Sequence, residues 1–406
     1  MLQDNAEAIS RKIGSSVEIA KIGIKDATKS RPLPSDQFTT DLVSIVDDPS
    51  IDVILELIGG VEPAGTLVRR AIENGKHVVT ANKELIAKHG SELMNLALAR
   101  GLDLHYEAAV GGGIPLVQPL KHQLAGNDVL KLMGILNGTT NYILTKMTEE
   151  GAEFDDVLRE AQSKGYAEAD PSADVDGFDS SYKVAILASI AFGRQVPIDQ
   201  VYREGIRRIT KTDIHYADML GYRIKLLGIV DPFGDRIMVR VHPTMIPKSH
   251  PLAAVNGVYN AVWIDGDFSG DLMFSGRGAG SEPTASAVIG DLIDVGRSMA
   301  KGIPGSVIAY GADQEVEPID SLRTSYYVRL TVDDRPKVLG HIASVFGDYE
   351  VGLASMEMRV VDAANQVGEI AFMTHECVEA DFKAAIRSIE EKKIVQRVAS
   401  WIRVED

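Results

Sequence analysis

Residues Val53–Lys83, VILELIGGVEPAGTLVRRAIENGKHVVTANK, decide the expected fold because they alternate short apolar runs with an amphipathic stretch. The runs Val53–Ile58 and Val78–Val79 have the character of buried strands, and Val61–Glu73 carries apolar residues at three- and four-residue spacing. A strand, a helix and a second strand in this order predict a parallel sheet that is covered by helices.

The same alternation continues on both sides of this segment. Strands are expected over residues 17–24 and 102–106, and a further amphipathic helix over residues 83–99. Residues 1–110 therefore predict an α/β domain, a Rossmann-like doubly wound parallel sheet that binds a dinucleotide.

Parallel sheets bind ligands at the carboxyl ends of their strands. Gly59 ends one predicted strand, and Lys83 follows another. Lys25, Lys29 and Arg31 follow the second strand of the pattern, where such a sheet distinguishes a ribose hydroxyl from a 2′-phosphate. These basic residues favour NADP over NAD, although a solvated basic loop explains them equally well.

Beyond the first sheet the alternation becomes irregular, and residues 111–283 predict an α+β domain for the substrate and for dimerisation. A helix over residues 284–299 has a strong apolar period without a following strand, so residues 284–310 are expected to return and complete the first domain. An acidic linker is expected over residues 311–325. Residues 326–406 read strand, helix, strand, strand, helix, strand, which predicts a ferredoxin-like βαββαβ domain whose edges pair with a second copy.

Charge and composition exclude several classes of function. The net charge of −16 and the absence of a basic tract argue against a nucleic-acid partner. No apolar run of about 18 residues indicates a membrane span, and the first residues lack a signal-peptide pattern. The single cysteine, Cys377, fits a reducing compartment, so the expected location is the cytoplasm.

Carboxylates crowd one lysine, Lys183. Glu168 and Asp174 precede it, and a helix that begins near Gly177 places Asp179 one turn before Lys183 on an apolar face. Burial lowers the pKa of a lysine and nearby carboxylates raise it, so the balance suits a proton donor for carbonyl reduction. The alternative is an ordinary helix ion pair beside a solvated acidic loop; the number of carboxylates favours the catalytic interpretation.

Three other segments are rich in glycine or small polar residues. The glycines of Glu107–Pro115 allow the backbone to approach a cofactor, or allow carbonyl groups to hold a cation together with Glu107, and a plain tight turn is the alternative. The glycines of Gly276–Thr284 offer amide groups to a dinucleotide at a helix N-terminus, with an interdomain hinge as the alternative. Asn137–Asn141 supplies small hydrogen-bonding groups after a predicted strand.

Taken together, these motifs resemble homoserine dehydrogenase in the form with a C-terminal ACT domain. The resemblance covers nearly the whole chain and rests on Val79–Lys83, Glu107–Pro115, Asn137–Tyr142, Gly165–Pro171, Asp179 and Lys183. It implies the reversible, NAD(P)H-dependent reduction of L-aspartate 4-semialdehyde to L-homoserine in threonine, methionine and isoleucine biosynthesis. It also implies threonine as a regulatory effector and a homodimer or homotetramer.

The resemblance further implies roles for single residues. Lys183 is the expected acid/base residue, and Asp179 positions it. The expected substrate-binding residues are Glu168, Asp174, Asp179 and Lys83. The expected dinucleotide-binding residues are Gly59, Lys83 and Gly280. A sodium ion is expected at Glu107 and at the backbone of Val110, Gly112 and Ile114.

The sequence departs from the family pattern in two places. The family opens with a strand and a glycine-rich phosphate loop, and this sequence starts in what corresponds to the following helix, so both elements are expected to be missing. Lys337 stands where ACT domains usually have glycine. A catalytically silent amino-acid-sensing subunit is therefore a second hypothesis, which titration with NADPH and threonine distinguishes. A semialdehyde dehydrogenase with a catalytic cysteine is disfavoured, because Cys377 lies in the regulatory domain.

Overall fold

The structure, a computed structural model, describes residues 1–29, 31, 35–303, 311 and 313–405. Its helices are α1 Ala6–Ile13, α2 Leu42–Asp47, α3 Ala64–Glu73, α4 Lys83–Ala99, α5 Gly138–Glu150, α6 Phe154–Ser163, α7 Ser172–Val175, α8 Phe178–Phe192, α9 Lys211–Met219, α10 Ser281–Lys301, α11 Val338–Asp348 and α12 Glu379–Glu391. Its strands are β1 Ile22–Gly23, β2 Phe38–Thr39, β3 Val53–Glu56, β4 His77–Thr80, β5 Leu104–His105, β6 Val129–Ile135, β7 Tyr202–Arg203, β8 Tyr222–Phe233, β9 Arg236–Pro247, β10 Tyr259–Gly266, β11 Gly270–Arg277, β12 Arg323–Asp333, β13 Leu353–Asp362, β14 Val367–Thr374, β15 Cys377–Val378 and β16 Arg397–Val404.

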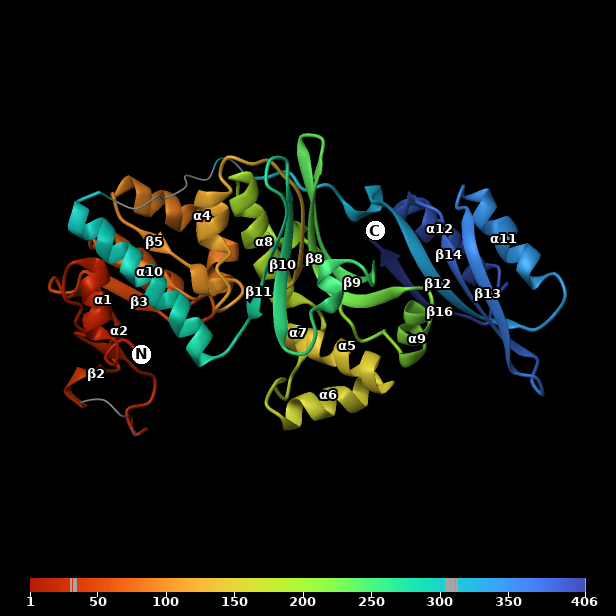
Figure 1. Ribbon diagram of the computed structural model, residues 1–406, viewed down its shortest axis with the longest axis horizontal. Coiled ribbons are helices and arrows are strands. Elements are labelled where there is room, and N and C mark those ends of the chain that lie inside the picture. Colours follow the sequence, from red (N-terminus) through yellow and green to blue (C-terminus); the bar gives the residue numbers. More distant parts are fainter. Residues whose placement is uncertain (30, 32–34, 304–310, 312, 406) are drawn as a thin grey trace.

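Figure 1 shows three parts along the long axis of the molecule. A small parallel sheet with helices lies at one end, a large antiparallel sheet occupies the middle, and the C-terminal helices and strands form the other end. This arrangement confirms the predicted fold class, with a Rossmann-like domain, an α+β domain and a C-terminal ferredoxin-like domain.

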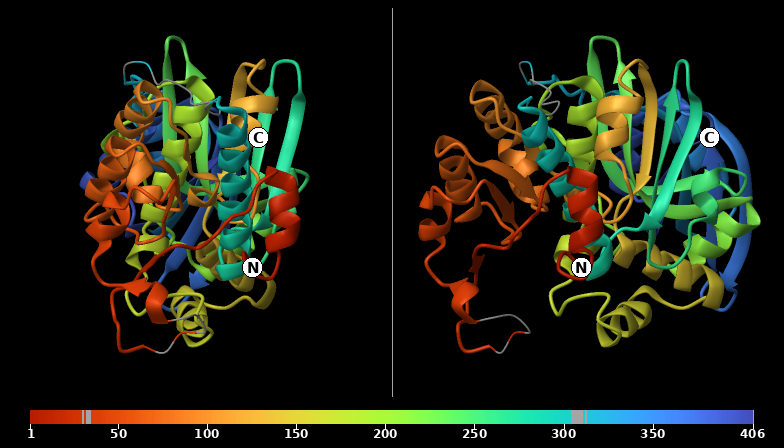
Figure 2. Two further views of the ribbon diagram at one scale, coloured as in Figure 1. Left: turned by 90° about the vertical axis from the view of Figure 1, so that its left-hand side faces the viewer. Right: turned by 60° about the vertical axis from the view of Figure 1, so that its left-hand side comes forward.

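The first part contains the parallel strands β3, β4 and β5, with Val53 opposite His77 and Val78 opposite Leu104. Helix α10 returns to this sheet from far along the chain and packs Val288 and Val295 against Val79 of β4. Figure 2 shows α10, in teal, beside the N-terminal helix α1 in both views. The strand expected over residues 17–24 is wrong in extent, because only the two residues of β1 have a partner strand, β2.

The second part and the C-terminal part share one sheet of 11 strands among the described residues. Its main path runs β11, β10, β6, β8, β9, β16, β12, β14 and β13. Strand β16 joins the two parts because it pairs in parallel with β9, with Arg403 opposite Thr244, and antiparallel with β12. Within the segment expected as a linker, residues 315–317 run along β9, where Glu317 N–H donates to the Ile237 carbonyl at 2.8 Å. The last three residues of that segment, 323–325, belong to β12. Residues 304–310 and 312, which the sequence assigns to the returning segment and the linker, lie outside the described residues.

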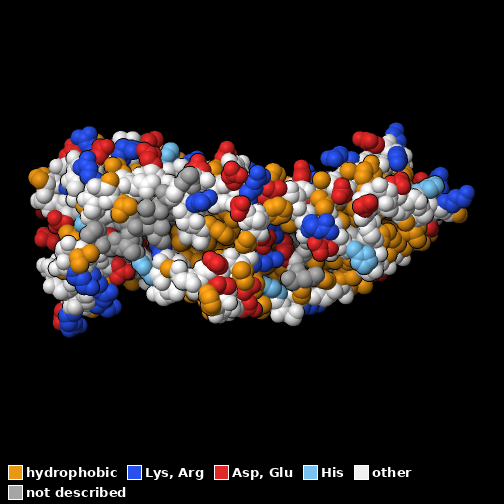
Figure 3. Space-filling view, turned by 90° about the horizontal axis from the view of Figure 1, so that it is seen from above, with side chains coloured by type: hydrophobic (Ala, Val, Ile, Leu, Met, Phe, Trp, Pro, Cys, Tyr) orange, Lys and Arg blue, Asp and Glu red, His pale blue; other side chains and the backbone are white. Residues whose placement is uncertain are grey.

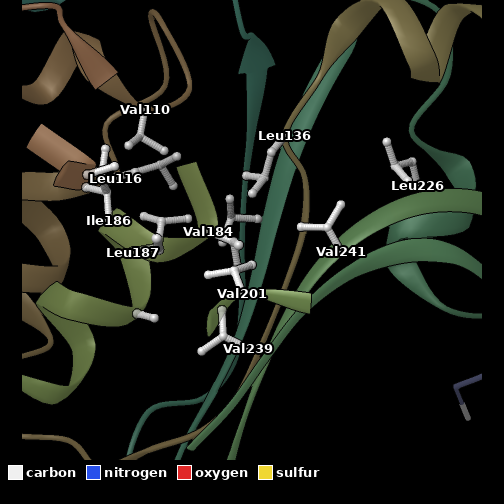
Figure 4. Close-up of a cluster of buried hydrophobic side chains, with 14 of the residues drawn as sticks. Val110, Leu116, Leu136, Val184, Ile186, Leu187, Val201, Leu226, Val239 and Val241 are labelled. Carbon is white, nitrogen blue, oxygen red and sulfur yellow. The ribbon is translucent and has the colours of Figure 1, made fainter. Parts of the chain in front are cut away.

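Helix α8 is the centre of the main hydrophobic core. Its residues Val184, Ile186 and Leu187 are buried. Figure 4 shows Val184 near Leu136, which follows β6, and near Val241 of β9. The apolar residues that follow Lys183 therefore pack α8 against the large sheet.

On the face shown in Figure 3, acidic and basic side chains are interspersed over most of the area. None of the helices in the described ranges is long and apolar enough to cross a lipid bilayer.

Candidate active site

Lys183 and Asp179 lie one turn apart on α8, and both side chains are buried. The Lys183 Nζ donates to the Asp179 carboxylate at 2.7 Å and to the Leu136 carbonyl at 2.7 Å. Burial lowers the pKa of the Lys183 ammonium, and this effect outweighs the opposing charge of Asp179. Lys183 is therefore held in place, and it loses its proton more readily than a lysine in water.

Asp179 connects this lysine to the first domain. Its second oxygen forms an ion pair with the Nζ of Lys83, the first residue of α4. Burial opposes the charged form of Asp179, but the charges of Lys183 and Lys83 overcome this effect and hold its pKa well below the ordinary value. A buried carboxylate thus stands between two lysines from two domains.

Asn137 joins a further carboxylate to the cluster. Its Nδ2 donates to Asp179 at 2.9 Å and to Asp174 at 2.7 Å, while its Oδ1 accepts from Thr140 N–H and so caps α5. Burial, together with the nearby charge of Asp179, raises the pKa of Asp174. The cap residue of one helix thereby fixes two acidic side chains.

The carboxyl ends of β3 and β4 form the adjoining edge of the first sheet. Glu56 accepts from Gly59 N–H at 3.2 Å and from the Thr80 hydroxyl at 2.5 Å, and Asn82 donates to the Gly60 carbonyl at 2.6 Å. Gly59 and Gly60 have φ values of 81° and 71°, which glycine adopts without strain. Side chains at these positions would meet nothing within 4 Å, so the backbone is open to a ligand. This fits a dinucleotide at the edge.

The segment before α10 lies beside the glycines of the first sheet's last loop. Gly113 N–H donates to the Arg277 carbonyl at 3.2 Å, and the backbone of Gly112 packs against Gly278. Gly280 is the cap residue of α10, with a φ of 118°. The two glycine segments thus contact each other through their backbones. The N-terminus of α10 lies directly after this contact.

Glu107 does not offer a free carboxylate for a cation. One oxygen accepts from Leu116 N–H at 2.6 Å and Val117 N–H at 2.9 Å, and the other accepts from Gln118 N–H at 2.8 Å. Burial raises the pKa of this carboxyl despite these bonds. No group of three or more His, Cys, Asp or Glu side chains among the described residues is placed to hold a metal ion. A cation here would rest on the carbonyl oxygens of Val110, Gly112 and Ile114.

Other predicted residues lie outside this cluster. The Glu168 side chain is exposed, and its backbone carbonyl accepts from Gln162 at 3.1 Å. Lys25 and Lys29 are exposed, and the Arg31 guanidinium donates to the Asp26 carbonyl at 2.9 Å. The structure therefore brings Asp174, but not Glu168, to the buried lysine.

Sequence reasoning missed three contacts that build the site. It assigned no role to the Leu136 carbonyl or to Glu56, and it noted the Asn137–Asn141 segment without identifying the cap. A signal existed for Asn137 only, since asparagine directly before an amphipathic stretch is a preferred helix cap. The other two contacts join residues far apart in sequence and leave no local pattern.

Comparisons with known proteins identify relatives of this chain. Family profiles match residues 2–107 (homoserine dehydrogenase, NAD binding domain), 115–293 (homoserine dehydrogenase) and 326–393 (ACT domain). The homoserine dehydrogenase of Synechocystis sp. is 46% identical over 401 residues, which cover 96% of this chain and 92% of that protein.

Two solved structures are also similar. The crystal structure of a homoserine dehydrogenase from Thiobacillus denitrificans superposes with a TM-score of 0.94 at 43% identity, covering 100% of this chain and 94% of that one. A hyperthermophilic archaeal homoserine dehydrogenase in complex with NADPH has a TM-score of 0.54 at 32% identity, covering 62% of this chain and 72% of that one.

Proposed function

Because the chain belongs to the homoserine dehydrogenase family, we propose that it catalyses the reversible oxidation of L-homoserine to L-aspartate 4-semialdehyde. The observation that carries this proposal is the Lys183–Asp179 pair, which is buried and linked to Lys83 at the edge of the dinucleotide-type sheet. Proton transfer at a carbon–oxygen bond needs a positioned acid–base group next to the cofactor, and a buried lysine with a lowered pKa can serve as one.

Lys183 exchanges the proton of the substrate. In oxidation its neutral amine accepts the hydroxyl proton, and in reduction its ammonium donates a proton to the carbonyl oxygen. Bonds to Asp179 and to the Leu136 carbonyl orient the Nζ. A bound nicotinamide dinucleotide supplies or accepts the hydride, and we assign its binding to Gly59, Lys83 and Gly280.

The charges around the pair suit an amino-acid substrate. Asp174, held by Asn137, is placed to attract the substrate's α-ammonium group, and Glu168 adds a negative charge at the exposed rim. Lys83, whose side chain is 42% exposed, is placed to attract the α-carboxylate.

We also propose finer features of this function. Lys25 and Lys29 favour NADP over NAD. A sodium ion is proposed on the carbonyls of Val110, Gly112 and Ile114 beside Glu107. Threonine is the proposed effector of the ACT domain. Strand β13 exposes Met356, Met358, Val360 and Val361 on the outermost strand of the sheet, which supports a homodimer or homotetramer.

The test is the reduction of NADP⁺ and of NAD⁺ by the purified chain with L-homoserine, followed by absorbance. Turnover with L-homoserine and none with L-serine or L-threonine is expected. A chain that binds threonine but neither NADPH nor NADH would be a sensing subunit, and the proposal would be rejected.

A further inference from the structure

Residues 202–207 form the backing of the turn that carries the acidic side chains. Ile206 N–H donates to the Val175 carbonyl at 2.8 Å, and Arg207 Nε lies 2.5 Å from Asp176. At Gly205 a Cβ would lie 2.2 Å from the same Val175 carbonyl, so the two backbones touch. Because Asp174 precedes Val175 directly, these contacts of the backing hold the Asp174 carboxylate in position in the site.

The backing is tied to the C-terminal domain by one buried arginine, Arg403 of β16. Only 1% of Arg403 is exposed. Its guanidinium donates to Glu204 at 3.1 Å and to the Tyr202 hydroxyl at 3.0 Å, and its Nε donates to Glu379 of α12 at 2.7 Å. Glu204 and Tyr202 belong to the backing, whereas Glu379 belongs to the ACT domain.

Arg403 therefore joins the backing to the ACT domain directly, and Lys383 of α12 adds a second cation, 5.4 Å from the centre of the Tyr202 ring. Burial of an arginine between carboxylates is favourable only with good geometry, and removal of one partner leaves the others uncompensated. Figure 1 shows β16 in the large sheet between β9 and β12.

We propose that Arg403, acting through Glu204 and Gly205, is a positioning residue that sets the place of Asp174 and so the affinity for the amino-acid substrate. The proposal rests on the proposed function, because Asp174 is assigned there to the substrate's ammonium group. It predicts that the last strand of the ACT domain contributes to substrate binding without touching the substrate.

Arg329 provides a matched control within the same junction. It too is a buried arginine of the ACT domain, and it pairs with Asp213 at 2.9 Å and Glu369 at 3.0 Å. Its partner Asp213 belongs to the capping box of α9, whose cap residue is Thr210, and not to the backing. Arg403→Met and Arg329→Met therefore remove the same chemistry from two places, of which only one leads to Asp174.

Two measurements on the full chain test the proposal. Steady-state kinetics should show that Arg403→Met raises the KM for L-homoserine about tenfold or more, because small misplacements of binding groups are costly. The KM for the dinucleotide should stay within about twofold in both variants. Hydrogen exchange should rise in residues 172–179 of Arg403→Met and stay at the wild-type level there in Arg329→Met.

Equal exchange in residues 172–179 of the two variants would overturn the inference, whatever the turnover. An unchanged KM for L-homoserine in Arg403→Met would also overturn it, provided that the wild type is active. An inactive wild type would instead reject the proposed function, and hydrogen exchange would still decide the inference. If Arg403→Met does not fold, Glu204→Gln and its control Glu369→Gln, a carboxylate that also pairs with an arginine and a tyrosine, are compared in the same way.

Discussion

At the scale of the residue, the chemistry depends on the Lys183 amine. Lys183→Met keeps most of the side-chain volume and removes the proton carrier, so kcat should fall about 10²–10⁴-fold in both directions. Asp179 keeps Lys83 as its partner, so the fold should survive. Fluorescence titration with NADPH and a thermal melt serve as controls. Turnover near the wild-type level with unchanged binding would remove the assigned role.

The opposite charges of Asp179 and Lys83 predict opposite shifts of the pH profile when each residue is replaced. Homoserine oxidation needs the neutral amine, so kcat should rise with pH through the lowered pKa of Lys183. Asp179 raises that pKa and Lys83 lowers it. The midpoint of the profile should therefore move to lower pH in Asp179→Asn and to higher pH in Lys83→Met. Shifts in the same direction would contradict the assignment of Lys183 as the titrating group.

At the scale of the element, the contact between the end of β7 and α7 has no spare room. Gly205→Ala should destabilise the protein by about 1–3 kcal/mol, because the added methyl overlaps the Val175 carbonyl. Gly340→Ala in α11 is the control: a Cβ there meets nothing within 4 Å, and alanine should stabilise the helix by up to about 1 kcal/mol. Urea unfolding measures both, and equal effects would refute the tight contact.

Elements with a strict apolar period could be predicted from the sequence, and contacts between distant elements could not. Helix α4 has the expected bounds, residues 83–99, and the pairing of Asp179 with Lys183 follows from their spacing. Within α4, however, the Gln195 amide accepts from Ser91 N–H at 2.9 Å and donates to the Ala87 carbonyl at 2.8 Å. These hydrogen bonds depend on a residue about a hundred positions away, so the spacing of residues within α4 does not predict them.

The same reason explains the missed features of the site. The second hydrogen-bond acceptor of Lys183, the Leu136 carbonyl, lies far from it in sequence. Because every residue has a carbonyl, the sequence does not indicate which one the lysine contacts. Glu168 was grouped with Asp174 because both precede the lysine, but the turn before α7 leaves Glu168 exposed. Proximity in sequence predicted which segment matters, and tertiary packing decided that Asp174, through its bond to Asn137, joins the cluster around the lysine.

At the scale of the whole molecule, buried ion pairs hold the ACT domain to the substrate domain. Glu405 lies 2.6 Å from Arg240 and 2.5 Å from Lys131. Burial raises the pKa of this carboxyl, but the two cations overcome the effect and keep it below the ordinary value of 4.5. The resulting stability is present above pH 4.5 and is lost as the pH falls through the lowered pKa.

Glu405→Gln should therefore lower the melting temperature at neutral pH. It should also reduce the fall of the melting temperature between neutral and acidic pH. Breaking a buried pair costs at most about 3–5 kcal/mol, and a neutral side chain of the same shape retains part of the bonding. Calorimetry at pH values above and below 4.5 measures the difference. The exposed Glu390→Gln is the control, and an identical acid response in the two variants would contradict the prediction.

The position of β16 within the large sheet affects how the protein is made. Among the described strands it leaves the ribosome last, yet it lies between β9 and β12. Until β16 has been synthesised, the edge of β12 that it covers and the end of β9 at Thr244 and Met245 are unpaired, and unpaired edges favour aggregation. Chains that stop before β16 would keep the parallel sheet β3–β4–β5 but leave this junction open, so they would remain targets for chaperones and proteases.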